Sequence, residues 1–97
     1  MKAEIFNYKK WINKTNSHEI TSCLNTLLLQ SDFVIINFVE HKFNNEGYTA
    51  LWLIAESHLA VHTFPEENKS YIELSSCNKT KNKKFIELFE QKIAGLE

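Results

Sequence analysis

Apolar residues recur at helical spacing in two segments of the chain. Asn16, followed three residues later by Glu19, is typical of the cap that begins a helix. A helix is therefore expected over residues 17–30, with one apolar stripe made by Ile20, Leu24, Leu27 and Leu28. A second helix should begin at Thr80 or Asn82. Its inward stripe would comprise Phe85, Leu88, Phe89, Lys92 and Ile93.

The other apolar segments alternate or are rich in β-branched and aromatic residues, which is typical of strands. They cover residues 3–8, 33–39 with a continuation toward Phe43, 48–55, 58–64 and 71–77. Polar residues 9–16 connect the first strand to the helix, and residues 44–47 and 65–68 form turns, with Gly47 able to take positive φ. The order β-α-β-β-β-β-α predicts an α+β two-layer sandwich, an antiparallel sheet with helices on one face.

The segment 48–55 is apolar at nearly every position, as in a strand that is covered on both faces. A single domain of 97 residues, 1–97, has little chain left to provide a second cover. A partner subunit would provide it, so we expect a homodimer or a higher homo-oligomer.

Charge and composition narrow the possible functions. The net charge is −1 and all eleven basic residues are lysines, which argues against a nucleic-acid partner. No apolar run reaches the length of a membrane span, and the N-terminus lacks the apolar block of a signal peptide. Two cysteines, Cys23 and Cys77, make no disulfide framework, so we expect a reduced, cytoplasmic protein.

Candidate chemistry gathers in residues 56–66, which read Glu-Ser-His-Leu-Ala-Val-His-Thr-Phe-Pro-Glu, and in Cys77. Taken alone, Ser57 would be a turn residue, His62 a sheet histidine and Cys77 a buried thiol. No G-x-S-x-G motif is present and Asp32 is the only aspartate, so a Ser-His-Asp hydrolase is disfavoured. The histidine and cysteine spacings fit no compact zinc pattern, so no metal is expected.

Residues 33–77 resemble the bacterial S-adenosylmethionine decarboxylases, small pyruvoyl-dependent enzymes. The likeness rests on residues 56–66, on the distance from Ser57 to Cys77, and on the upstream groups His41-Lys42-Phe43 and Gly47-Tyr48-Thr49. The resemblance implies a proenzyme that cleaves itself between Glu56 and Ser57, giving chains 1–56 and 57–97. Ser57 would be the nucleophile and would become the pyruvoyl group, His62 would remove the proton that drives elimination, and Thr49 would assist processing.

The same resemblance implies decarboxylation of S-adenosylmethionine, which supplies the aminopropyl donor for spermidine. The substrate amine would form a Schiff base with the pyruvoyl group derived from Ser57. Cys77 would return a proton to the substrate, Glu66 would hold the ribose hydroxyls and Phe43 would stack on the adenine.

Two other functions stay open. The first strand lacks the family's Gly-x-His and Asp-x-Tyr-Gly-Cys groups, and the C-terminus is short compared with the family's, so the same machinery could act on another amino acid. Asn78 also replaces a glycine of the family. A non-catalytic relative that remains unprocessed is the other alternative.

The positions of Ser57 and His62 set a geometric condition on the proposed site. The two residues are five positions apart, so on one straight strand their side chains would lie on opposite faces. They could cooperate within one chain only if the chain turns near residues 56–58.

Overall fold

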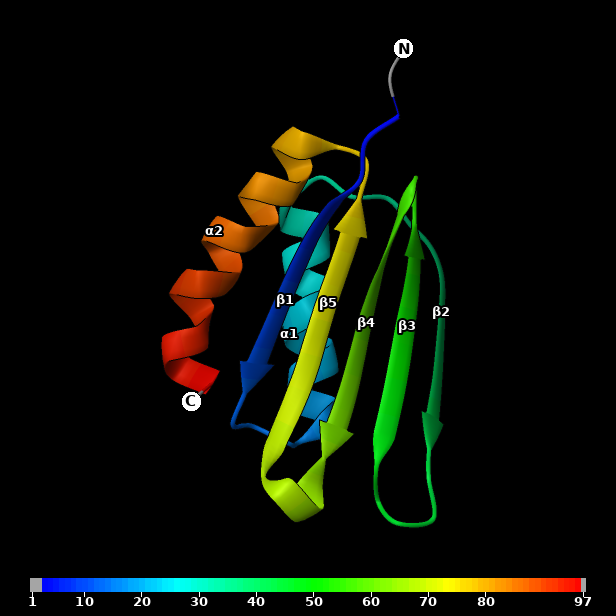
Figure 1. Cartoon of the computed structure of the whole chain (residues 1–97), viewed down its shortest axis with the longest axis vertical. Helices are drawn as coiled ribbons and strands as arrows, with labels where there is room; N and C mark the ends of the chain where they lie inside the picture. Colours follow the sequence, from blue (N-terminus) through cyan, green and yellow to red (C-terminus); the bar gives the residue numbers. More distant parts are fainter. Residues whose placement is uncertain (1–2, 97) are drawn as a thin grey trace.

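The computed structural model describes residues 3–96, with side chains through Ile93. Five strands form one antiparallel sheet in the order β1-β5-β4-β3-β2, and two helices pack on one face of it, as Figure 1 shows. The predicted two-layer α+β sandwich is therefore confirmed. The elements in chain order are β1 (Phe6–Ile12), α1 (Ser17–Gln30), β2 (Ile35–Lys42), β3 (Tyr48–Ile54), β4 (Ser57–Phe64), a short 3-10 turn (Pro65–Glu67), β5 (Lys69–Ser76) and α2 (Lys79–Leu96).

Both helices begin at asparagine caps. Asn16 Oδ1 accepts a hydrogen bond from the Glu19 backbone N–H at 3.0 Å, so α1 has the predicted bounds. Asn78 Oδ1 accepts one from the Lys81 N–H at 2.9 Å, and α2 therefore begins at Lys79, earlier than predicted. Lys92 is exposed, so its predicted place in the inward stripe is wrong.

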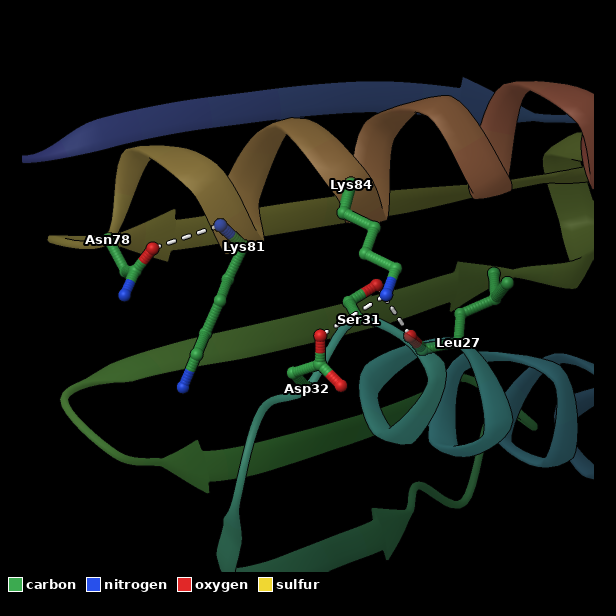
Figure 2. A network of polar contacts seen from close by, with 6 residues as sticks. All are labelled: Leu27, Ser31, Asp32, Asn78, Lys81 and Lys84. Carbon is green, nitrogen blue, oxygen red and sulfur yellow. Dashed lines mark hydrogen bonds and ion pairs between the residues drawn. The ribbon is translucent and has the colours of Figure 1, made fainter.

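Polar contacts tie the end of α1 to the start of α2 (Figure 2). The Ser31 hydroxyl donates to the Leu27 carbonyl at 2.7 Å and satisfies one of the free carbonyls at the end of α1. Asp32 follows with φ of 67°, and its carboxylate pairs with the Lys84 ammonium of α2 at 3.1 Å. These contacts fix the turn that leads from α1 into β2.

The two faces of the sheet differ sharply. On the helix-facing side, Trp52, Leu59 and Val61 are at most 1% exposed and pack in one core with the helices. On the open side, Val39, Leu51 and Leu53 are 53%, 44% and 53% exposed. The second cover expected for β3 is therefore not provided by the described part of this chain.

Two local predictions are corrected. Strand β1 runs to Ile12 rather than ending near Tyr8, because Ile12 enters the core and the Tyr8 hydroxyl donates to Glu90 of α2 at 2.6 Å. In the hairpin between β2 and β3, positive φ falls on Glu46 (70°) and not on Gly47. Neither helix of the described chain combines the length and apolar composition that a membrane crossing requires.

Candidate active site

Ser57 is the first residue of β4, directly after the turn at Ala55 and Glu56. It pairs with Ile54 of β3 and Ser76 of β5. By strand alternation its side chain lies on the same face as Leu59 and the helices. Its Oγ is buried and has no hydrogen-bond partner among the described residues. A buried hydroxyl without a partner is unusual and is a reasonable position for a reactive group.

The Cys77 thiol lies beside the peptide bond that precedes Ser57. Its Sγ donates to the Glu56 carbonyl oxygen at 3.3 Å and lies 4.0 Å from the Glu56 carboxylate. Residue 77 follows the last residue of β5, and Ser57 pairs with that residue across the ladder. Adjacent strand ends thus bring together two residues that are 20 positions apart in the sequence.

A cavity of about 480 Å³ opens next to this thiol. Glu56 and Cys77 line it together with residues of the N-terminal segment and α2, namely Ala3, Glu4, Ile5, Phe6 and Lys79. The sequence analysis missed this contribution. Phe6 pairs with Ser76 because β1 lies beside β5, and this long-range pairing leaves no local pattern in the sequence.

A second cluster lies at the opposite end of β4. The Thr49 hydroxyl and Nδ1 of His62 are 2.9 Å apart, and the two residues are direct partners in the β3–β4 ladder. The structure thus places Thr49 and His62, two residues predicted to act in processing, next to each other. A cavity of about 480 Å³ adjoins them and is lined in part by Phe43, Glu66 and Phe64. The two residues expected to bind substrate thus lie with His62.

The two clusters do not meet within one chain. Strand β4 is continuous from Ser57 to His62, and five residues of strand span roughly 17 Å. Ser57 faces the helices, whereas His62 lies on the open face with His58 and Ala60. The chain turns at Ala55–Glu56, before Ser57, so the turn required for cooperation within one chain is absent from this hairpin. Figure 1 shows the two ends of β4 at opposite ends of the sheet.

Comparison with known proteins identifies the family. The sequence model of one family, described as S-adenosylmethionine decarboxylase, matches residues 3–95. The chain therefore belongs to the S-adenosylmethionine decarboxylase family. Two relatives are each named S-adenosylmethionine decarboxylase proenzyme. The one from Prochlorococcus marinus (strain MIT 9313) is 29% identical over 77 residues, and the one from Clostridium botulinum (strain Hall) is 33% identical over 64 residues.

These matches cover 78% and 66% of this chain, but only 62% and 55% of the respective relatives. The chain thus spans little more than half the length of these two proteins. The fold is also similar to the crystal structure of the adenosylmethionine decarboxylase from Aquifex aeolicus VF5, with a TM-score of 0.78 and 16% sequence identity. That alignment covers 97% of this chain and 83% of the solved one, and it supports the shared fold.

Proposed function

We propose that the chain is a proenzyme that cleaves itself between Glu56 and Ser57 and then decarboxylates S-adenosylmethionine. The observation that carries the proposal is the Cys77 thiol at 3.3 Å from the Glu56 carbonyl oxygen. That carbonyl belongs to the bond that would break, and the residue after it carries a buried hydroxyl without a partner. The proenzyme names of the relatives add support.

In the self-cleavage step, the Ser57 hydroxyl attacks the Glu56 carbonyl carbon, and the acyl group moves from nitrogen to oxygen. A base then takes the α-proton of residue 57, so that the new ester breaks and Glu56 leaves as a carboxylate. Water replaces the nitrogen of residue 57, which departs as ammonia and leaves a pyruvoyl group. The Cys77 thiol can donate to the Glu56 oxygen as negative charge develops there, as an oxyanion hole does.

His62 is the proposed base, and a second copy of the chain can supply it. In a two-fold pair, the same surface of each copy contacts the other, and residues from opposite ends can meet. Packing of open faces would bring His62 and Thr49 of one copy toward Ser57 and Cys77 of the other. The exposed apolar side chains Val39, Leu51 and Leu53 provide the surface for such a contact.

The residues of the two clusters divide the work on the substrate. A pyruvoyl group at residue 57 would supply an electron-withdrawing carbonyl that accepts the electrons released with carbon dioxide. Phe43 would contact the adenine and Glu66 the ribose hydroxyls, since both line the cavity beside His62. Cys77, at the end of β5, would donate the proton that replaces the carboxyl group.

Intact mass measurement tests self-cleavage. The wild-type protein is expected to give two fragments, residues 1–56 and residues 57–97, the second and smaller of which lacks the nitrogen of Ser57. Ser57→Ala is expected to remain one chain. Splitting of Ser57→Ala at the same bond would refute the nucleophile assignment. Carbon dioxide release from S-adenosylmethionine, compared with release from other amino acids, then tests the substrate. Release only from another amino acid would leave the cleavage mechanism standing and overturn the substrate.

A further inference from the structure

Four side chains form a row across the open face of the sheet at its His62 end. The ladder pairs Thr49 of β3 with His62 of β4, His62 with Tyr71 of β5, and Tyr71 with Trp11 of β1. All four lie on the face away from the helices by strand alternation. His62 is therefore flanked by a cross-strand neighbour on each side.

The two neighbours make different contacts with the imidazole. Thr49 Oγ1 lies 2.9 Å from Nδ1, whereas the Tyr71 ring is nearly parallel to the imidazole, with centroids 6.4 Å apart and planes at 17°. The Thr49 contact restrains one edge of the imidazole, and the flat Tyr71 ring beside it further restricts rotation of the imidazole plane about the Cβ–Cγ bond. With Nδ1 engaged, Nε2 is the nitrogen left for a reacting proton.

Other side chains hold Tyr71 in place. Trp11 contacts it from the far side, with ring centroids 5.0 Å apart, and the Lys69 ammonium lies 4.7 Å from the Trp11 centroid. The Tyr71 hydroxyl donates to the Glu73 carboxylate at 3.4 Å. Loss of solvent around the ring, together with this carboxylate, raises the pKa of Tyr71. The residue is thus neutral at physiological pH and adds no charge beside His62.

We propose that Tyr71, supported by Trp11, is a positioning residue that fixes the imidazole plane of His62 and directs its Nε2 to the reacting proton. This inference rests on the proposed function, because it assumes that His62 is the base in self-cleavage. Tyr71 itself does not touch the scissile bond and acts only through the orientation of His62. The flat ring is the part that matters, and the hydroxyl is dispensable.

A matched pair of variants, Tyr71→Phe and Tyr71→Leu, tests the role of the ring. Both side chains are apolar and suit a strand, but only phenylalanine keeps a flat ring. The self-cleavage rate should stay within about twofold of wild type for Tyr71→Phe and fall about tenfold or more for Tyr71→Leu, because small misplacements of a catalytic group are costly. Equal rates for the two variants would overturn the proposal, whether both are fast or both are slow.

A second measurement does not depend on cleavage. In the Ser57→Ala background, nitrogen–proton correlation spectra of the His62 ring report its tautomer, which is single only while the ring is held with Nδ1 hydrogen-bonded to Thr49. One tautomer is expected with tyrosine or phenylalanine at position 71, and an averaged mixture with leucine. Identical ring spectra for all three would refute the positioning role. If wild-type protein never cleaves but the spectra change as expected, the proposed function fails and the positioning of His62 stands.

Discussion

The two ends of β4 carry different halves of the proposed chemistry. At the Ser57 end, the residue after one peptide bond carries a buried hydroxyl, and the Cys77 thiol donates to the carbonyl oxygen of that bond. At the His62 end, an imidazole bonded to Thr49 adjoins a cavity on the open face. The first cluster has the nucleophile and the thiol but no base, and the second has the base but no scissile bond. Under the proposed function, the described residues of one chain thus form two half-sites and not one complete site.

The two faces of the sheet support the same conclusion. The helix-facing side is closed by α1 and α2, so Ser57 cannot be reached there by another chain without disrupting the core. The turn at Glu56 and the residue Cys77 are exposed, as is much of the open face. A second copy would therefore approach the scissile bond from the open side, where His62 also lies.

Mixing two inactive variants tests the half-site interpretation most directly. Ser57→Ala and His62→Ala are each expected to remain uncleaved alone. Coexpressed, they form mixed pairs in which Ser57 and Cys77 of one chain face an intact His62 of the other. Every His62→Ala chain in a mixed pair should then cleave, because each such pair has one complete site at Ser57 of that chain; with random pairing of equal amounts this is about half of all His62→Ala chains.

Intact mass reports this result, since the two variants differ in mass. Coexpression of Ser57→Ala with Ser57→Ala/His62→Ala is the control and should yield no fragments. If His62→Ala cleaves alone at the wild-type rate, His62 is not the base. If the coexpressed variants also stay intact while the wild-type protein cleaves, Ser57 and His62 must act within one chain.

Cys77→Ala separates the two roles of the thiol. The chain should still split, because Ser57 and the base remain, but more slowly, because the donor to the Glu56 oxygen is lost. Turnover of S-adenosylmethionine by the cleaved chain should fall by about 10² to 10⁴, the usual contribution of a general acid. Steady-state carbon dioxide release, normalised to the fraction of cleaved chain, measures this loss. Turnover that remains normal after this correction would remove Cys77 from the proton-donor role.

Much of the fold follows from periodicity, because apolar spacing reflects which face each segment buries. The α1 bounds and the alternation of β4 are correct for this reason. The extension of β1 to Ile12 was missed because Lys9 and Lys10 look like a connection, although antiparallel pairing with β5 tolerates lysines. Sequence spacing cannot reveal that β1 lies beside β5.

The candidate site was predictable as a set of residues but not as a geometry. The motif at residues 56–66 placed Ser57 and His62 close in sequence, whereas strand parity and rise separate them in space. The one available signal was that positions 57 and 62 are an odd number of residues apart, which places their side chains on opposite faces of a straight strand. Strand β4 is such a strand. The contact of Tyr71 with His62 depends on register between β4 and β5, which no local pattern specifies.

Leu53→Lys tests whether the open face meets a second copy. Leu53 is 53% exposed on this face, and Leu29, 56% exposed on α1, is a matched control on the helical layer. Lysine at position 53 should weaken self-association about tenfold or more, because a two-fold contact would bury two such charges. Leu29→Lys should leave association unchanged. Sedimentation of the two variants in the analytical ultracentrifuge compares their self-association.

Cleavage should follow association in these variants. Dilute Leu53→Lys protein should cleave slowly and regain its rate as concentration rises, whereas Leu29→Lys should cleave as wild type at all concentrations. Fast, concentration-independent cleavage of a monomeric Leu53→Lys protein would contradict the half-site interpretation.

The smallest effect is expected from Asn78, which follows Cys77 and caps α2. Asn78→Ala removes the hydrogen bond from the Lys81 N–H and should lower the free energy of unfolding by about 1 kcal/mol, measured by urea denaturation. Asn78→Asp keeps an acceptor and should retain most of the stability.

The cap at Asn78 also holds the backbone next to Cys77, so Asn78→Ala should slow turnover slightly. The Thr49–His62 contact lies at the other end of the sheet and should be undisturbed. A change in the His62 ring spectrum of Asn78→Ala would mean that the two ends are coupled within one chain.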